Sequence, residues 1–441
     1  MKARYAWLLA VSTALAAGGG AYAQGETPAP LDAAARARAI DGVLLRLREG
    51  YVFPEVAEKM EKSVRERAAN GAYDKLDGPG LAQALTADLR AVSNDKHVRV
   101  GYSAEVLPPE PERPDSLTPE MAEELRKQMA RDNFGLEKLD ILKGNVGYLS
   151  FRLLAPPEVA AETYAAAMTY LTNTDALIID LRRCGGSISP DAIPMLCTYF
   201  FEKPTHLNDI YWRPENTMRQ FWTWAHVPGK RYLGKPIYIL TSPATFSGAE
   251  ELAYDLQNLK RAVVVGETTG GGANPGGDRR ADDHFTVWVP VGRAINPISK
   301  TNWEGVGVKP DVEVPVAAAL HRAHTLALRK VVEAMEAGPR KEWTQNLLAE
   351  VERSAPALKK VTFRLEGYPE AREVRVAGTF NSWTPELSPL VRKGDAWTAE
   401  VLVEPGRHAY KFVVDGRWMV DPANPEREGE GEFVNSIRVV Q

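Results

Sequence analysis

Residues 236–256 read PIYILTSPATFSGAEELAYDL, which is the pattern of a strand, a turn and a helix in succession. The apolar run ends at Thr241, the turn contains Pro243, and helical spacing begins at Ser247. Other short β-type runs alternate with helical stretches along residues 144–336; they are Val146–Phe151, Ala176–Leu181, Ala262–Val265 and Thr286–Pro290. This alternation predicts an α/β (α+β) core.

The part of the chain before this core has a helical pattern. Apolar residues recur at helical spacing from Leu31 to Arg90, so we predict an N-terminal helical region over residues 24–103. Four prolines between positions 108 and 114 disfavour helix. Residues 104–143 are therefore predicted to form an extended linker followed by one helix.

The part after the core ends in a β-rich region. Ala337-Gly338-Pro339 stops a preceding helix, and residues 337–358 read as a polar helical spacer. Beyond it, alternating runs are separated by turn signals such as Asp415-Gly416. The runs are Val374–Ala377, Trp397–Val403, His408–Val414 and Ser436–Val440. Residues 359–441 are predicted to be an immunoglobulin-like all-β sandwich.

The first 23 residues have the three parts of a secretory signal peptide. Lys2 and Arg4 precede an apolar run, and Ala21-Tyr22-Ala23 offers a small-residue cleavage site. A membrane anchor is the alternative, but the apolar run is short and ends in three glycines. We expect cleavage before Gln24, no membrane span afterwards, and export to a periplasm or the cell exterior.

Composition excludes several classes of protein. The 441 residues are 44% hydrophobic and 25% charged, which argues against disorder. A formal net charge of −4 gives no electrostatic reason to expect nucleic acid as a partner. Only two cysteines occur, Cys184 and Cys197, so no disulfide framework holds the fold, and whether the two pair is left open. No pattern calls for a metal or another cofactor.

Ser247 is the candidate nucleophile. A serine at a helix N-terminus sits where backbone N–H groups and the positive end of the helix dipole converge, which suits an oxygen that becomes anionic. The alternative is structural, because Ser247-Gly248-Ala249-Glu250 also spells a helix-capping box. Gly185 and Gly186, just past another strand, are candidate oxyanion donors together with Gly248, although a tight turn needs the same glycines.

Five stretches in one order resemble the tail-specific, or C-terminal-processing, serine peptidases. They are YVFPEVAEKM at 51–60, SNDKHVRV at 93–100, DLRRCGG at 180–186, TSPATFSGAEE at 241–251 and NWEGVGVKPDVEV at 302–314. The most similar branch is that of interphotoreceptor retinoid-binding protein. The resemblance covers about residues 31–331 and implies a catalytic core of the ClpP/crotonase-like type.

The resemblance assigns roles to particular residues. Ser247 is implied as the nucleophile, with oxyanion donors at Gly248 and in the Gly185-Gly186 loop. One branch of the family uses a lysine base about two dozen residues after the serine; here that position reads Thr269-Gly270-Gly271-Gly272, without lysine. A branch similar to the tricorn core protease uses a histidine and a glutamate, which fall on His97 and Glu304. A carboxylate on the far ring nitrogen would fix the tautomer of His97, and Ser93 and Lys96 are further candidates for orienting that ring.

Two departures from the family pattern matter. Cys184 stands where the family usually has asparagine before the paired glycines, which affects the expected shape of the oxyanion loop. Residues 104–143 are too short and too polar for the peptide-binding PDZ module that many tail-specific proteases carry. Recognition of a substrate's C-terminal tail is therefore not implied.

Residues 361–441 resemble the glycogen-binding module of the AMP-activated protein kinase β subunit. The matching stretches include VRVAGTFNSW at 374–383, PGRHAYKFVVDGRW at 405–418 and VNS at 434–436. The resemblance implies an aromatic platform of Trp383 and Trp418, with Lys411 and Asn435 as polar partners of sugar hydroxyls. The alternative for any tryptophan in a sandwich is the core, and Trp397, in an alternating strand, is assigned there.

The sequence as a whole predicts an exported serine endopeptidase with a Ser247–His97–Glu304 arrangement, directed to glycans by its C-terminal module. The expected partners are a protein or peptide substrate and an α-glucan or another polysaccharide. Two alternatives stay open: a non-catalytic protein that binds apolar ligands on the same architecture, and a carbohydrate-binding adaptor. The oligomeric state is not indicated.

Overall fold

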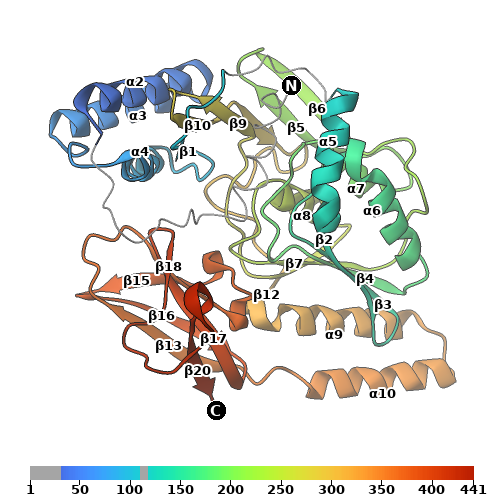
Figure 1. Cartoon of the computed structure of the whole chain (residues 1–441). Helices are drawn as coiled ribbons and strands as arrows, with labels where there is room; N and C mark the ends of the chain where they lie inside the picture. The colour runs from blue at the N-terminus through green and yellow to red at the C-terminus, as the bar shows by residue number, and fades with distance from the viewer. Residues whose placement is uncertain (1–30, 110–117) are drawn as a thin grey trace.

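The computed structural model describes residues 31–109 and 118–441. The predicted signal peptide, residues 1–23, lies outside the described residues, as does most of the proline-rich linker. Figure 1 shows three parts along the chain: blue N-terminal helices, a green and yellow α/β core, and a red β-domain at the C-terminus. Long α9 (Val316–Ala334) and α10 (Pro339–Arg353) connect the core to that β-domain.

A six-stranded sheet forms the centre of the core, in the order β12-β8-β7-β4-β3-β2. The strands are β2 (Leu136–Leu142), β3 (Val146–Phe151), β4 (Ala176–Asp180), β7 (Ile237–Thr241), β8 (Val263–Gly266) and β12 (Val312–Glu313). All are parallel to their neighbours except β2. Side chains of α9 pack on one face, and those of α6 (Pro157–Leu171), α7 (Ala192–Thr198) and α8 (Gly248–Asn258) pack on the other. Because both faces are covered, every residue of β3, β4 and β7 is buried and most are apolar, as expected for the strands predicted there.

A second, smaller sheet joins the N-terminal region to the core. Strand β1 (Arg99–Tyr102) pairs with β10 (Phe285–Pro290), which pairs with β9 (Gly276–Arg280). Helices α2 (Ala33–Gly50), α3 (Pro54–Ala69) and α4 (Gly78–Ser93) share one hydrophobic core with β10. The helices are as predicted, but their core is completed by a strand about 190 residues further along the chain. This pairing brings residues 95–98 against the segment that precedes β9.

A third sheet, in the order β11-β5-β6, was not predicted from the sequence. Its strands are β5 (His206–Trp212), β6 (Thr217–Trp222) and β11 (Gly292–Ile295). The hairpin β5–β6 has polar residues on both faces, and five of the six positions of β6 are exposed. Without apolar alternation, these strands carry little sequence signal.

Residues 359–441 form an antiparallel sheet that curls so that its two halves face each other around one core. The order is β13-β16-β15-β14-β17-β20-β19, with β18 beside β17. The strands are β13 (Lys359–Glu366), β14 (Val374–Gly378), β15 (Pro389–Lys393), β16 (Ala396–Val403), β17 (Gly406–Val414), β18 (Arg417–Met419), β19 (Arg427–Glu428) and β20 (Asn435–Val440). Trp397 lies in this core, as predicted.

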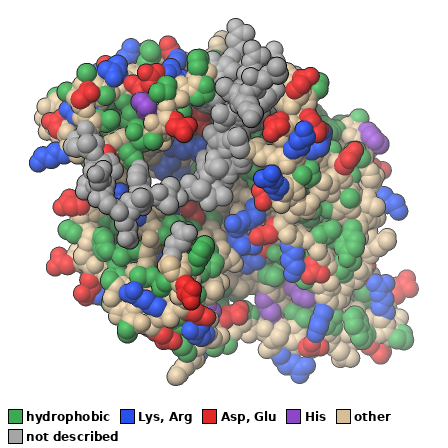
Figure 2. All heavy atoms as spheres, viewed as in Figure 1, with side chains coloured by type: hydrophobic (Ala, Val, Ile, Leu, Met, Phe, Trp, Pro, Cys, Tyr) green, Lys and Arg blue, Asp and Glu red, His purple; other side chains and the backbone are tan. Residues whose placement is uncertain are grey.

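Two smaller findings complete the fold. Cys184 and Cys197 are both buried and both free, which answers the question that the sequence left open. Across residues 31–109 and 118–441, none of the helices has the length and apolar character needed to cross a membrane. Figure 2 shows basic and acidic side chains intermixed over the visible face.

Candidate active site

Ser247 lies at a sharp turn between β7 and α8. Its backbone has φ 53° and ψ −125°, a conformation that residues other than glycine rarely adopt. Helix caps elsewhere in this protein look different: Asp32, Asp77 and Thr118 all have extended backbones and accept an N–H bond through the side chain. A helix cap therefore does not need the strained backbone of Ser247. Backbone strain of this kind is found where a strand-to-helix turn presents a nucleophile.

Glu250 holds this turn in place. Its buried carboxylate accepts the N–H of Ser247 at 2.8 Å, so half of the predicted capping box is present. The same carboxylate accepts the hydroxyl of Thr269 at 2.5 Å and the N–H groups of Gly271 and Gly272 at 2.6 and 2.9 Å. Burial raises the pKa of Glu250 to about 7, although these hydrogen bonds favour its charged form. Glu250 thus ties the Ser247 turn to the loop 269–272.

The loop after β4 lies directly against Ser247. A Cβ atom added to Gly186 would come within 2.9 Å of the Cβ of Ser247, and one added to Gly248 within 2.3 Å of the Oγ of Ser187. Only glycine fits at both places without movement. The N–H of Gly185 donates to the carbonyl of Arg152 at 3.1 Å, so Gly185 is not among the donors that we propose. Within the described chain, the N–H groups of Gly186 and Gly248 have no hydrogen-bond acceptor.

His97 packs onto the residue that precedes Ser247. Its ring centroid lies 4.6 Å from that of Phe246, with the planes tilted by 43°. Gly272 lies under both rings, because a Cβ there would come within 2.3 Å of Phe246 and 2.7 Å of the Cε1 of His97. No hydrogen bond joins the Oγ of Ser247 to His97 among the described residues. The two are brought together through Phe246 and Gly272.

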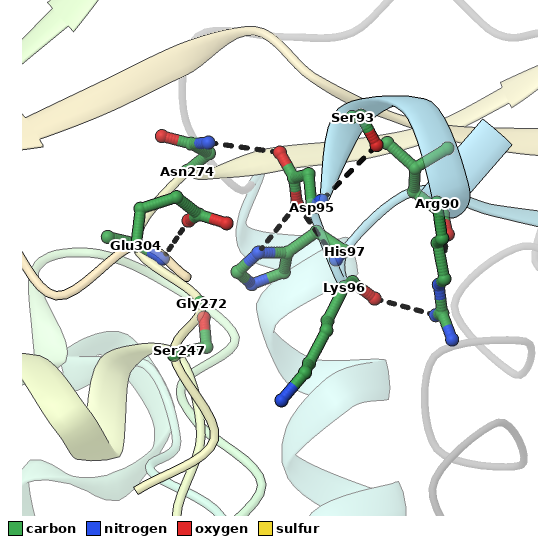
Figure 3. Close-up of polar contacts among 12 residues, drawn as sticks. Arg90, Ser93, Asp95, Lys96, His97, Ser247, Gly272, Asn274 and Glu304 are labelled. Carbon is green, nitrogen blue, oxygen red and sulfur yellow. Dashed lines mark hydrogen bonds and ion pairs between the residues drawn. The ribbon is translucent and has the colours of Figure 1, made fainter. Parts of the chain in front are cut away.

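Two carboxyl groups surround the imidazole (Figure 3). The Nδ1 of His97 lies 3.6 Å from the Oδ1 of Asp95, and that oxygen also accepts the backbone N–H of His97 at 2.9 Å. Glu304 accepts the N–H of Ala273 through Oε2 at 2.5 Å. One ring nitrogen of His97 and one oxygen each of Asp95 and Glu304 all lie within 4.8 Å of one another.

The two carboxyl groups have opposite pKa shifts. Burial works against the charged form of Asp95, but the nearby imidazole of His97 and the hydrogen bonds from the His97 backbone N–H and from Asn274 hold the pKa of Asp95 below its usual value. Burial, followed by the charge of Asp95, raises the pKa of Glu304 to about 8. Asp95 is therefore the ionised neighbour of His97 at neutral pH, and Glu304 carries a proton.

The structure therefore brings His97, Glu304 and the Ser247 turn to one place, and it adds residues that the sequence analysis did not assign. Asp95 has the closer contact to His97, whereas the orienting role of Glu304 stays a prediction. Ser93 accepts the N–H of Asp95 at 3.2 Å, and Lys96 donates to the carbonyl of Gly270 at 2.5 Å. Within the described part of the chain, neither side chain is hydrogen-bonded to the His97 ring. An acidic residue two positions before the histidine was the available signal for Asp95.

Replacing Gly272 by alanine is expected to lower kcat by about 100-fold, because the new methyl group displaces His97 and Phe246. The thermal unfolding midpoint, measured beside the kinetics, shows whether the loss reflects misplacement or unfolding. A Gly272→Ala protein with wild-type kcat would show that the packing under His97 has no part in positioning it.

The C-terminal domain carries a pair of exposed aromatic rings. The centroids of Trp383 and Trp418 lie 6.2 Å apart at 44°, with exposed fractions of 36% and 43%. Trp418 is opposite Val413 on β17, so it shares a sheet face with Lys411, two residues earlier. Asn435 begins β20 and precedes Ser436, the partner of Tyr410. The four predicted sugar-binding residues thus belong to three neighbouring strands and the loop after β14.

Three family models match the chain, in the order of its domains. Residues 35–134 match the N-terminal domain of Peptidase_S41 in eukaryotic IRBP, and residues 145–314 match peptidase family S41. Residues 360–441 match the glycogen recognition site of AMP-activated protein kinase. The two peptidase models together account for more than half of the chain.

Curated relatives match the C-terminal domain. The β-2 subunit of 5′-AMP-activated protein kinase from Homo sapiens is 35% identical over 95 residues, which is 22% of this chain and 34% of the relative. The β-1 subunit from Rattus norvegicus is 37% identical over 109 residues, 24% of this chain and 38% of the relative. The chain thus spans only about a third of the length of these relatives.

The solved structures that match this chain are distant in sequence. A putative peptidase from Parabacteroides merdae has a TM-score of 0.49 at 16% identity, covering 68% of this chain and 99% of its own. The photosystem II D1 C-terminal processing protease has a TM-score of 0.38 at 15% identity, covering 64% of this chain and 94% of its own.

The α/β core and the family matches define the class of this protein, a serine-type peptidase. With both peptidase models matched in one order, the chain belongs to peptidase family S41, and it carries a C-terminal module of the glycogen-recognition type.

Proposed function

We propose that this protein hydrolyses peptide bonds through an acyl-enzyme on Ser247, with His97 as the base. The observation that supports it best is the packing of His97, flanked by Asp95 and Glu304, on Phe246 and Gly272 beside the strained Ser247 turn. A serine hydroxyl is a weak nucleophile near neutral pH, and an adjacent imidazole supplies the base that it needs.

In the proposed mechanism the two nitrogens of His97 have separate tasks. Nδ1 faces Asp95, which leaves Nε2 to take the proton of Ser247 as the hydroxyl attacks the carbonyl carbon. His97 then returns the proton to the leaving amine. In the second half of the reaction, His97 takes a proton from a water molecule, which attacks the acyl-enzyme and releases the acid product. Base assistance of this kind contributes about 10²–10⁴ in rate.

The N–H groups of Gly248 and Gly186 are proposed to hold the negative oxygen of the tetrahedral intermediate. They flank Ser247 and have no acceptor within the described residues. Gly248 is also the first residue of α8, where the helix dipole favours negative charge. One such donor contributes about 10²–10³ in kcat.

Rapid-quench mass spectrometry tests the covalent step. After mixing with a peptide ester, the intact protein should gain the mass of the acyl group, and digestion should place the adduct on the peptide that contains Ser247. Turnover without any adduct, or with an adduct on another residue, would contradict the proposal.

The raised pKa of Glu304 predicts how stability depends on pH. A carboxyl group that titrates near pH 4.5 when unfolded and at about 8 when folded stabilises the fold fully below pH 4.5, and this contribution is lost as pH rises to 8. We expect the wild-type unfolding midpoint to fall from pH 6 to pH 9, and the Glu304→Gln midpoint to fall less. Equal falls in both proteins would mean that Glu304 is not protonated in the fold.

We further propose that the C-terminal domain binds α-glucan through Trp383 and Trp418, with Lys411 and Asn435 as polar partners. Indole rings offer an apolar surface to the C–H face of a sugar. Such binding would raise the local concentration of the peptidase at a glycan-bearing surface. Export directed by residues 1–23 is part of this proposal, since it would place the enzyme where such surfaces occur.

Replacing Trp418 by alanine is expected to weaken maltoheptaose binding by at least about tenfold, because an exposed aromatic contact is lost. Isothermal titration calorimetry of the full chain with maltoheptaose measures the affinity of the wild type and of the variant. Trp343→Ala is the control, since Trp343 is 59% exposed on α10, in the spacer before the domain. Equal affinities of the two variants would place the sugar site elsewhere.

A further inference from the structure

Two buried polar atoms around His97 have no hydrogen-bond partner. They are the Nδ1 of His97 and the Oε1 of Glu304, both without a partner among the described residues. His97 is only 9% exposed, and the 3.6 Å between its Nδ1 and Asp95 is too long for a good hydrogen bond. Unpartnered atoms of this kind are costly in a protein interior, so they point to a missing ligand at this position.

The atoms that converge there are a suitable donor set for a metal ion. One imidazole nitrogen and two carboxyl oxygens lie within 4.8 Å of one another. Binding of the ion would release the proton of Glu304 to solvent. In a tetrahedral zinc site, ligand atoms about 2.1 Å from the ion are separated by roughly 3.4 Å. The distance of 3.6 Å between His97 and Asp95 already fits this value. Glu304 needs to approach by at most about 1.4 Å, and its free oxygen has no bond to break.

The outer oxygens of both carboxyl groups are already fixed, as metal ligands usually are. The Oδ2 of Asp95 accepts Asn274 at 3.0 Å and Tyr51 at 3.3 Å, and the Oε2 of Glu304 accepts the N–H of Ala273. The Oδ1 of Asp95 accepts one backbone N–H and keeps a second lone pair. Such outer hydrogen bonds orient the ligands of a metal site.

We propose that Asp95, His97 and Glu304 form a zinc-binding site whose occupation switches the peptidase off. A mixed nitrogen and carboxylate set suits Zn²⁺, whereas Mg²⁺ prefers oxygen ligands only. The binding itself does not depend on the proposed function, but the inhibition rests on it. Water fills the fourth position of the ion.

Inhibition follows from the chemistry of imidazole. A neutral ring has one lone pair on nitrogen, and zinc on Nδ1 takes it. The remaining N–H is then on Nε2, which donates a hydrogen bond and accepts no proton from Ser247. Zinc also neutralises Asp95, whose charge would stabilise the imidazolium. A bound ion therefore removes the base without touching the serine.

The binding test uses the full chain with Ser247→Ala and aqueous zinc chloride, titrated against a chromophoric chelator. We expect one zinc ion per chain, and an affinity at least about 100-fold weaker when His97→Ala is added. His206→Ala is the matched control, because His206 also pairs with a carboxylate, that of Asp209, at 2.6 Å. Equal zinc affinity with and without His97, or no zinc bound at millimolar concentration, overturns the site.

A second variant guards against misfolding of the histidine mutant. Glu304→Gln keeps a carbonyl oxygen for the N–H of Ala273 and puts an amide in place of the free oxygen. We expect it to weaken zinc binding by about tenfold or more, and to change the visible spectrum of the protein loaded with Co²⁺. An unchanged affinity and spectrum would exclude Glu304 as a ligand and overturn the three-residue site.

Peptide hydrolysis by the wild type tests the consequence. Zinc should abolish turnover, EDTA should restore it, and equal magnesium should have no effect. Zinc bound at these residues with full activity overturns the inhibition. If zinc binds as expected but the protein hydrolyses no peptide under any condition, the proposed function fails and the metal site stands. If peptides are cleaved and no zinc binds, the metal site fails alone.

Discussion

Replacing Ser247 by alanine is expected to lower kcat/KM for peptide hydrolysis by about 10⁴–10⁶, down to the uncatalysed background. The hydroxyl is the atom that attacks, and no other hydroxyl is presented on the same strained turn. Hydrolysis of a fluorogenic casein derivative by purified proteins measures the effect. The unfolding midpoint should stay close to wild type, because the hydrogen bond from the backbone N–H of residue 247 to Glu250 is kept.

Ser354→Ala is the matched control for this variant. Ser354 caps the end of α10 in the spacer, and its hydroxyl donates only to the carbonyl of Val351 among the described residues. It should keep wild-type turnover. A Ser247→Ala protein that retains more than a tenth of wild-type activity would exclude an acyl-enzyme on Ser247.

The second large effect is expected at Asp95. Asp95→Asn should lower kcat by about 10²–10⁴, because an amide no longer holds His97 in the tautomer that accepts a proton, nor stabilises the imidazolium. Glu304→Gln should lower kcat by less than about tenfold at pH 7, since Glu304 is already protonated at that pH. Steady-state kinetics of both variants, on one substrate at pH 7, compare the two carboxyl groups directly.

The comparison distinguishes two assignments of the orienting carboxylate. If Glu304→Gln loses more activity than Asp95→Asn, the original sequence-based assignment of Glu304 is right and Asp95 is structural. Because Asp95 is buried and bonded to Tyr51 and Asn274, its variant must first be shown to unfold at a similar temperature. Tyr51→Phe, which removes one of those bonds but leaves the carboxylate, controls for indirect effects.

The strands of the core were predictable because their burial is uniform. Runs such as Val146–Phe151 and Ile237–Thr241 lie between two layers of helices, so every residue is buried and most are apolar. The β5–β6 hairpin was not predictable on these terms, since most of β6 is exposed and both strands carry polar residues without regular alternation. In the C-terminal domain, alternation placed Trp397 inside and turns placed Trp383 and Trp418 outside.

The sequence motifs predicted the residues of the candidate site but not the contacts between the segments that carry them. Ser247 and His97 each stand in a recognisable stretch, but the contact between their segments depends on pairing of β1 with β10. Glu250 read as a cap from sequence, because its bonds to Gly271 and Gly272 require the folded loop. From sequence, Gly272 was only part of the stretch that lacks the lysine base, and its place under His97 is visible only in three dimensions.

The most direct test of the serine–histidine account is labelling with a fluorophosphonate, which reacts only with an activated serine. The account predicts rapid labelling of Ser247 in the wild type and a loss of rate of at least about 100-fold in His97→Ala. Tryptic mass spectrometry locates the label, and the unfolding midpoint confirms that the variant is folded. Equal labelling rates in the two proteins, or a label on another serine, would contradict His97 as the base and Ser247 as the nucleophile.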